Sequence, residues 1–305
     1  MPKKGYKTVF IFLDTDKHAS PFDMLTTIDV LSDVDILKYE NVTVEDVDNM
    51  VQDMMFPRGP KGVKHTKIFL NGRDLNRIND ILQKIKESMF PPFELSVVVD
   101  PRGAYTTATA AVAKTLKLSL QKDLGNLKEK KVTVLAGTGP VGQTAARLYA
   151  SEGAEVIVTS RSINRASAVA EKVNEELGEQ RVKGAEAKTD EGVGKAIESA
   201  EIILSAGAAG IQLLPLETLK KYGKNCKIVA DINAVPPLGV EGLNPDSDGE
   251  DVTDQVMGIG ALAIGKLKNC VEAQLIQRAA EEPKGIFDYE IAYEIGKDTI
   301  RQELE

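Results

Sequence analysis

The glycine-rich loop Gly137-Thr138-Gly139-Pro140-Val141-Gly142 is the segment whose residue types and spacing have the clearest chemical meaning. A β-branched, apolar segment precedes it and a helical pattern to about Glu152 follows it, which is the context of a dinucleotide-binding loop. The first glycine would allow a tight turn, the second would admit a pyrophosphate to the backbone, and the third would pack helix against strand. Amides at the helix N-terminus would then face the phosphates. We therefore predict a dinucleotide site, and a purely structural turn is the alternative.

The residues after the next predicted strand, Glu155–Thr159, indicate which dinucleotide is bound. NAD sites commonly place an acid there, which accepts a hydrogen bond from the ribose 2′-hydroxyl. This chain has Ser160 and Arg161 instead, with Arg165 four residues further on. Guanidinium groups bind a 2′-phosphate that an acid would repel. We predict NADP, with NAD as a weaker possibility, and ordinary solvated arginines at a helix start are the competing interpretation.

Along the chain, β-branched segments that predict strands alternate with segments of helical pattern, and these elements would position the loop. Such alternation is typical of an α/β fold with parallel sheets. The polar stretch Gln121–Lys130 is the best domain boundary, and Asn244–Asp254 is predicted to be a surface loop. We predict an α/β substrate domain over residues 1–125, completed by a C-terminal helix at 286–305, a Rossmann-type NADP-binding domain over 126–285, and an interdomain cleft. The predicted strands are Thr8–Leu13, Lys67–Leu70, Leu95–Asp100, Lys131–Ala136, Glu155–Thr159, Val182–Ala187, Ile202–Ser205 and Lys227–Asp231.

Composition argues against several classes of function. The 305 residues carry a formal net charge of −8 with basic residues interspersed among acids, which does not suit a nucleic-acid partner. Apolar runs are only a few residues long, whereas a bilayer span needs about 20, and the N-terminus lacks the apolar region of a secretory signal. The cysteines and histidines, Cys226, Cys270, His18 and His65, have no metal-ligand spacing. We predict a cytoplasmic protein with no membrane segment, nucleic-acid partner or metal.

Several further motifs point to one enzyme family. Beside the segment 134–142, they are Asp14-Thr15-Asp16, Arg58-Gly59, Thr106-Thr107, Ser205-Ala206-Gly207-Ala208, Asn233-Ala234-Val235-Pro236-Pro237-Leu238-Gly239 and Gly285-Ile286-Phe287-Asp288. In these motifs, which keep their order over essentially the whole chain, the sequence resembles the NADP-dependent methylene-tetrahydromethanopterin dehydrogenases of methylotrophic bacteria, which are related to methylene-tetrahydrofolate dehydrogenases. The glycine loop and the Asn-Ala-x-Pro-Pro-Leu-Gly stretch are the most specific parts of the resemblance.

The resemblance implies an oxidoreductase of one-carbon metabolism that transfers a hydride from methylene-tetrahydromethanopterin to NADP⁺, without metal or flavin. It also implies a homo-oligomer, a trimer or a hexamer, while tetrahydrofolate stays open as an alternative carrier. The donor carbon of such a substrate lies between two nitrogens, whose lone pairs stabilise the product cation. No side chain then has to remove a proton, and the protein's tasks are orientation, water exclusion and electrostatics.

The candidate pterin-binding residues follow strands of the first domain, at the edge where open α/β sheets bind ligands. Carboxylates there suit the amino and ring N–H donors of a pterin. Helix capping is the alternative for Asp14, Asp16 and Thr106. The candidates are Asp14, Asp16, Asp100, Arg102, Thr106 and Thr107.

Lys268 matches by position the lysine that the family places at the pterin, whereas Lys266 has no family counterpart. A lysine there can hydrogen-bond a pterin carbonyl or ring nitrogen and so orient the donor carbon. Its charge would disfavour the forming cation, so we expect orientation and not acid–base catalysis. An exposed lysine at a helix start is the alternative. The resemblance also implies that Ala206, Gly207 and Asn233 contact the cofactor.

Two other interpretations of the whole chain stay open. Ser160-Arg161-Ser162-x-x-Arg165 also resembles the NADP clamp of shikimate dehydrogenases, although those enzymes need an early Lys/Asp pair that the charged residues here do not match. A non-catalytic NADP-sensing protein is the second alternative. Arg58 and Lys61 would either meet an anionic pterin tail or be solvated, and His18 and His65 are predicted to be surface residues.

Overall fold

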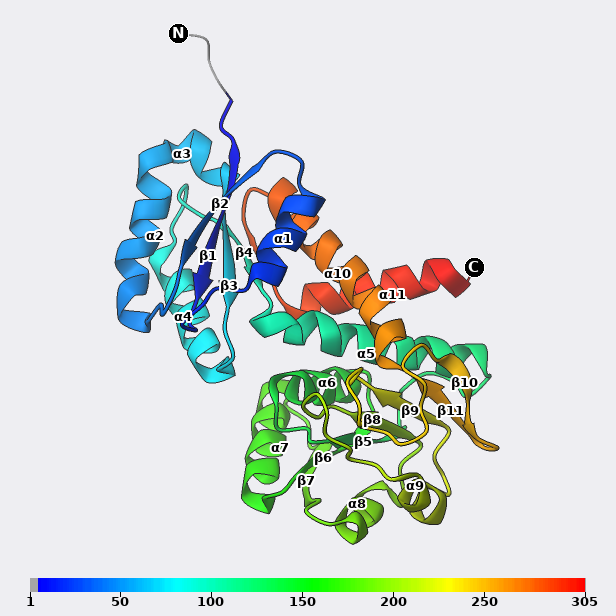
Figure 1. The fold of residues 1–305 in the computed structure, drawn as a ribbon. Coiled ribbons are helices and arrows are strands. Elements are labelled where there is room, and N and C mark those ends of the chain that lie inside the picture. The colour runs from blue at the N-terminus through cyan, green and yellow to red at the C-terminus, as the bar shows by residue number, and fades with distance from the viewer. Residues whose placement is uncertain (1–4, 305) are drawn as a thin grey trace. The chain divides into compact units, whose positions relative to one another are not determined.

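The computed structural model describes residues 5–304, which form two compact α/β units (Figure 1). The first unit comprises the residues up to Thr106 together with Cys270–Ile295, and the second comprises Thr107–Asn269 together with the residues from Gly296 on. Each unit has its own mainly parallel sheet with helices against it, which confirms the predicted α/β class. Among the helices of residues 5–304, none has the length and apolarity needed to cross a membrane.

The first unit contains a parallel sheet in the order β12-β4-β3-β1-β2. The central strands are buried on both faces, as their continuous apolar sequence predicts, and Phe12 stacks on Phe69 with ring centroids 4.7 Å apart. Sequence reasoning missed β2 because this edge strand leaves most of its side chains exposed. The strands are β1 (Thr8–Asp14), β2 (Val34–Tyr39), β3 (Thr66–Asn71), β4 (Ser96–Val99) and β12 (Gly285–Phe287).

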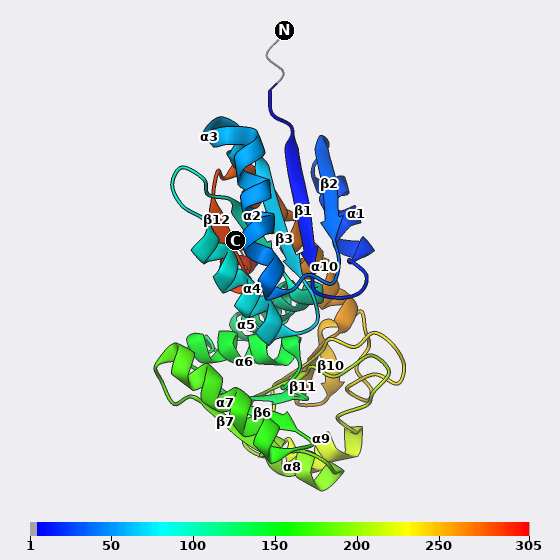
Figure 2. The same cartoon turned by 90° about the vertical axis from the view of Figure 1, so that its left-hand side faces the viewer.

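Helices α2 (Val47–Met55) and α4 (Leu75–Ser88) cover one face of this sheet, and Figure 2 shows them in front of it. Asp74 caps α4 by accepting hydrogen bonds from the amides of Asn76 (3.0 Å) and Arg77 (3.3 Å). The apolar residues of α4 at helical spacing are buried in the core with those of α2. The short helix α3 (Gly59–Gly62) follows α2.

Helix α1 (Pro21–Val30) buries polar residues and exposes apolar ones. Asp23 and Thr27 are buried, whereas Phe22, Leu25 and Ile28 are 56%, 59% and 50% exposed. Sequence reasoning missed this helix because its apolar residues do not mark its buried face. The inward polar side chains take part in a cluster described below.

The second unit contains a sheet in the order β10-β11-β9-β8-β5-β6-β7, parallel except that β10 runs antiparallel to β11. Followed from β7 to β11, the strands stand in the 3-2-1-4-5-6 order of a Rossmann fold. The prediction of a surface loop at Asn244–Asp254 was wrong in part, because the polar edge strand β10 lies within this segment. The strands are β5 (Lys131–Leu135), β6 (Glu155–Ser160), β7 (Val182–Glu186), β8 (Ile202–Ser205), β9 (Ile228–Asp231), β10 (Asp248–Thr253) and β11 (Val256–Ile259).

Helices cover both faces of this second sheet (Figure 1). Those on one face are α6 (Pro140–Ser151) and α7 (Ile163–Leu177), and those on the other are α8 (Asp190–Ile197) and α9 (Leu216–Tyr222). Thr115 joins α5 to α6 through a hydrogen bond between its Oγ1 and Tyr149 Oη (3.0 Å). The long helices α5 (Ala104–Gln121), α10 (Ala261–Glu281) and α11 (Tyr289–Leu304) each have residues in both units.

Candidate functional site

The glycine loop follows β5 at the carboxyl edge of the second sheet, where the strand order reverses between β5 and β8. Ala136, directly after the strand, has a φ of 52°, a left-handed conformation that non-glycine residues seldom adopt. Its amide donates to Thr159 Oγ1 (3.1 Å), and the Gly137 amide donates to the Thr159 carbonyl (2.9 Å). The end of β6 therefore holds the turn at the position where open α/β sheets bind ligands.

Gly142 and Gly139 of the loop differ in their surroundings. A Cβ at Gly142 would lie 2.5 Å from Gly137 Cα, so α6 packs directly on the turn. At Gly139 the nearest atom to an added Cβ would be the Ala136 carbonyl oxygen at 4.0 Å, which leaves this backbone open to a ligand. Gly139 is also the N-cap residue of α6 and has no side chain that could accept from the first amides of the helix, which begin at Val141 because Pro140 has no N–H.

A cavity of about 330 Å³ opens beside this loop. Ser160 is buried, and its Oγ accepts a hydrogen bond from the Ser162 amide (3.3 Å). Arg161 and Arg165 are exposed, and no carboxylate within residues 5–304 forms an ion pair with either guanidinium. Both cations are therefore available to an anion. The residues lining the cavity include Ala136, Thr138, Ser160, Arg161, Arg165, Gly207 and Ala208.

The other predicted cofactor residues follow β8 and β9. Ala206 continues the sheet, since its amide donates to the Leu135 carbonyl (3.0 Å), and Gly207 after it lines the cavity. Asn233 does not line the cavity. Its Oδ1 accepts from the amides of Gly210 (3.2 Å) and Val235 (2.8 Å), and its Nδ2 donates to the Pro237 carbonyl (2.9 Å). These contacts make Asn233 the residue that holds two loops of this edge together.

The first unit holds a polar cluster at the carboxyl ends of β1 and β3, which we call the Asp14 cluster: Asp14, Asp16, Asp23, Asn71 and Arg102. The Arg102 guanidinium donates to Asp16 Oδ2 through Nε (2.9 Å) and Nη2 (2.7 Å), and Nη2 also lies 3.3 Å from Asp14 Oδ1. Asp14 is fully buried, and burial raises the pKa of its carboxyl while the nearby guanidinium lowers it. Three of the predicted pterin-binding residues therefore come together.

The two carboxylates of this cluster differ in their surroundings. Asp14 accepts hydrogen bonds from the amides of Asp16 (2.8 Å) and Ser20 (3.2 Å), so it shapes the loop between β1 and α1. The Asp16 side chain is 20% exposed and faces Arg102. Asp16 is the carboxylate that a ligand can reach.

Sequence reasoning missed Asn71 and Asp23, which complete the Asp14 cluster. Asn71 ends β3 and is fully buried, and its Nδ2 donates to Asp23 Oδ2 (2.5 Å). No sequence pattern marks either residue, apart from the position of Asn71 at the end of a buried strand. Asp14, Asn71 and Asp100 lie at the carboxyl ends of the neighbouring strands β1, β3 and β4.

Asp100 and Thr106 form the start of α5. Asp100 Oδ1 accepts from the amides of Tyr105 (2.9 Å) and Thr106 (3.3 Å), and its Oδ2 accepts from Thr106 Oγ1 (2.6 Å). These are the bonds of a helix cap, with Asp100 in the role that the capping alternative gave to Thr106. Thr107 is half-buried in the first turn.

Lys268 and Lys266 lie on α10 and differ in burial. Because α10 begins at Ala261, Lys268 lies beyond its second turn, not at a helix start. Lys268 is buried, whereas Lys266 is exposed. Glu272 is also buried and follows Lys268 by four residues, a spacing that places both on one face of the helix.

Comparison with known proteins identifies the family. Residues 21–102 match the family described as methylene-tetrahydromethanopterin dehydrogenase, N-terminal, and residues 118–241 match the shikimate/quinate 5-dehydrogenase family. The chain is 37% identical to the bifunctional protein MdtA of Methylorubrum extorquens, over 96% of this chain and 98% of the relative. The chain belongs to the methylene-tetrahydromethanopterin dehydrogenase family.

Two further comparisons concern a second relative and the fold. The NAD(P)-dependent methylenetetrahydromethanopterin dehydrogenase of the same bacterium is 32% identical, over 95% of this chain and 97% of the relative. Among solved structures, ornithine carbamoyltransferase from Pyrococcus furiosus is similar with a TM-score of 0.53 at 10% identity, covering 89% of this chain and 84% of that one. This last likeness concerns the fold alone. The family that the sequence motifs suggested is confirmed.

Arg58 lies away from the carboxyl edge of the first sheet. Arg58 donates to the carbonyls of Lys7 and His65, which lie before the starts of β1 and β3, and its guanidinium lies 5.5 Å from the centre of the Tyr6 ring. This environment holds Arg58 in the structure at the amino edge of the sheet. Of the two histidines, His18 contributes its carbonyl to Arg102 (2.6 Å).

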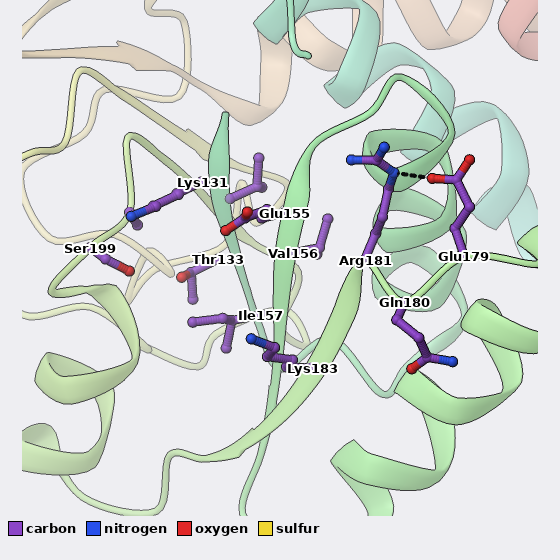
Figure 3. A pocket seen from close by; sticks show the side chains of 12 residues that line it. Lys131, Thr133, Glu155, Val156, Ile157, Glu179, Gln180, Arg181, Lys183 and Ser199 are labelled. Atoms are coloured by element: carbon purple, nitrogen blue, oxygen red, sulfur yellow. Dashed lines mark hydrogen bonds and ion pairs between the residues drawn. The ribbon is translucent and has the colours of Figure 1, made fainter. Parts of the chain in front are cut away.

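A larger hollow of about 560 Å³ lies on the second sheet, at the amino ends of β5, β6 and β7 (Figure 3). Lys131, Glu155 and Lys183 line it, as do Arg181 and Glu179, which form an ion pair. Because nucleotides bind at the carboxyl edge of such sheets, the smaller cavity beside the glycine loop is the better cofactor site.

Proposed function

We propose that this chain oxidises methylene-tetrahydromethanopterin with NADP⁺, giving the methenyl-pterin cation and NADPH. The observation that carries the proposal is the open glycine loop with two available guanidinium groups in one cavity, in a chain of this dehydrogenase family. Methylene-tetrahydrofolate is the alternative carrier, because it presents the same reacting carbon between two nitrogens.

The chemistry demands little of the side chains beyond binding. Departure of the hydride leaves a positive charge that the two flanking nitrogens share, so the reaction needs no general base. NADP⁺ accepts the hydride when bound. The chain's residues orient the pterin and the nicotinamide and exclude water from between them.

For the cofactor, the geometry supports separate sites for the pyrophosphate and for the 2′-phosphate. Thr138 and Gly139, with the amides of Val141 and Gly142 that follow Pro140 at the start of α6, bind the pyrophosphate, and Gly137 makes the turn possible. Ser160, Arg161 and Arg165 bind the 2′-phosphate and so favour NADP over NAD. Gly207 lines the same cavity, Ala206 precedes it at the end of β8, and Asn233 supports the adjoining loop.

For the pterin, the Asp14 cluster supplies the polar groups. Asp16 and Arg102 present an acceptor and a donor that match the amino and carbonyl groups of a pterin ring, and Asp14 shapes the loop that carries Asp16. Asp100, Thr106 and Thr107 form the helix start beside this cluster. Lys268 orients the donor carbon.

The proposal extends to the molecule's organisation. We infer a pterin-binding domain at 1–125 with the helix at 286–305, an NADP-binding domain at 126–285, a cytoplasmic location, and a homo-trimer or homo-hexamer as the resemblance implies. Sedimentation equilibrium measures the last of these, and a monomer at all concentrations would contradict it.

The decisive experiment is a steady-state comparison of methylene-tetrahydromethanopterin and methylene-tetrahydrofolate, each with NADP⁺ and with NAD⁺, followed by the absorbance of the reduced cofactor. We expect turnover with the first pterin and a preference for NADP⁺. Absence of turnover with either pterin contradicts the dehydrogenase assignment, and tight NADP binding in that case would favour a sensor. Shikimate serves as a negative control, since the match to that family concerns the nucleotide-binding part.

A further inference from the structure

Asn71 occupies the centre of the Asp14 cluster, and no part of the proposed mechanism uses it so far. Its Oδ1 accepts two hydrogen bonds, from the Gly72 amide (2.7 Å) and from the Arg102 amide (2.8 Å). Its Nδ2 donates to Asp23 Oδ2 (2.5 Å). The side chain is fully buried and therefore has one orientation that satisfies both ends.

The bond to the Arg102 amide acts on a strained residue. Arg102 has φ 52° and ψ 39°, a left-handed conformation that is unfavourable for a non-glycine residue. In this conformation its guanidinium reaches Asp16 at 2.7 and 2.9 Å, Asp14 at 3.3 Å and the His18 carbonyl at 2.6 Å. The hydrogen bond that the Arg102 amide donates to the buried Asn71 Oδ1 helps to hold that backbone conformation.

The bond to Asp23 fixes which end of the Asn71 amide faces Arg102. Asp23 lies on the inner face of α1 and is buried, and as a carboxylate it can only accept. It therefore requires the Nδ2 end of Asn71, which directs Oδ1 toward Arg102. Helix α1 thus sets the orientation of the amide that supports the arginine.

We propose that Asn71, oriented by Asp23, is a positioning residue for pterin binding that holds Arg102 in the conformation that aligns Asp16. The inference rests on the proposed function, in which Asp16 and Arg102 bind the pterin. Asn71 itself touches neither the cofactor nor the reacting carbon. Its loss therefore weakens binding of the pterin in both the ground state and the transition state, which raises KM and leaves kcat little changed.

The test exchanges the two polar side chains. Asn71→Asp keeps the acceptor for Arg102 but sets two carboxylates against each other, and we expect KM for the pterin to rise by about tenfold or more, with kcat and the KM for NADP⁺ little changed. In the double variant Asn71→Asp with Asp23→Asn, the amide at position 23 donates back to the carboxylate at position 71. We expect KM to return to within about threefold of the wild-type value.

Asn174→Asp is the matched control. Asn174 is a buried asparagine of the second unit whose Oδ1 also accepts from two amides, those of Arg181 (3.0 Å) and Val182 (2.9 Å). This variant should lose stability while KM for the pterin stays unchanged. A wild-type enzyme inactive with both pterins refutes the proposed function. If the wild type is active, two outcomes refute only the role of Asn71 and leave the proposed function standing. One is an Asn71→Asp variant with the wild-type KM for the pterin, and the other is a double variant that is insoluble or whose KM does not recover.

Discussion

At the scale of single residues, Lys268 and Lys266 form a natural pair for mutagenesis. They lie two residues apart on α10, but Lys268 is buried and Lys266 is exposed. If Lys268 orients the pterin, Lys268→Ala should lower turnover by roughly 10²-fold, about 2.7 kcal/mol of transition-state free energy. Affinity for NADP⁺ should be nearly unchanged, and Lys266→Ala should have a much smaller effect. Steady-state kinetics and cofactor titration measure both quantities, and a Lys268→Ala enzyme with wild-type kcat/KM contradicts the role.

Arg161 offers a second test at this scale. It lines the cavity beside the glycine loop and has no carboxylate partner among residues 5–304, so the partner expected from the proposed function is the 2′-phosphate of NADP. Because a hydrogen bond to a charged group contributes about 1.5–3 kcal/mol, Arg161→Ala should weaken NADP⁺ binding by roughly tenfold or more and leave NAD⁺ binding unchanged. Titration calorimetry measures both affinities. The control is Lys195→Ala, which removes an exposed cation already paired with Glu191. Equal losses for the two cofactors would contradict the assignment.

At the scale of elements, Lys67 joins β3, β4 and the end of α10. It is fully buried, and its Nζ donates to Ser96 Oγ (3.2 Å) and to the Glu282 carbonyl. Burial lowers the pKa of Lys67 to about 8. The unfolded chain keeps the ordinary value of about 10.4, so between these two values the unfolded state binds more protons and stability rises with pH. Below about pH 8 the buried charge costs at most about 3 kcal/mol.

This linkage gives a measurable slope. The free energy of unfolding, obtained from urea denaturation above and below about pH 8, should increase with pH in the wild type and increase less in Lys67→Met. Lys86→Met removes an exposed lysine of α4 and should keep the wild-type slope. Identical slopes for Lys67→Met and the wild type would show that this amine does not titrate in that range.

At the scale of the whole molecule, the apolar side chains that α1 exposes predict how the chain tolerates polar substitutions. Phe22, Leu25 and Ile28 point away from the core of the first unit, because Asp23 and Thr27 occupy the inner face. Replacing the three with serine should change the free energy of unfolding of the single chain by only about 0.5 kcal/mol each. Ile78→Ala, in the core, should cost about 2–5 kcal/mol. A triple variant as unstable as Ile78→Ala would mean that another surface covers these residues.

The sequence by itself determined the parts of the molecule that depend on local order. The strand, glycine loop, helix and arginine-bearing strand end are consecutive, so their residue types and spacing predict the Rossmann unit. Buried strands such as β1 are equally visible, because a strand covered on both faces is apolar throughout. The edge strands β2 and β10 and helix α1 were missed, since exposure or inverted burial removes that signal.

Only the tertiary structure decided which polar residues meet. Asn71 bonds to Asp23 across 48 positions and to Arg102 across 31, and no periodicity of the chain encodes either pairing. The parallel sheet brings the ends of β1 and β3 to one edge, and there it buries side chains that must satisfy one another. In the folded chain Asp100 caps a helix, and Arg58 lies at the amino edge of the first sheet. The sequence states the type of each residue, but its hydrogen-bond partners depend on which strand ends lie side by side in the fold.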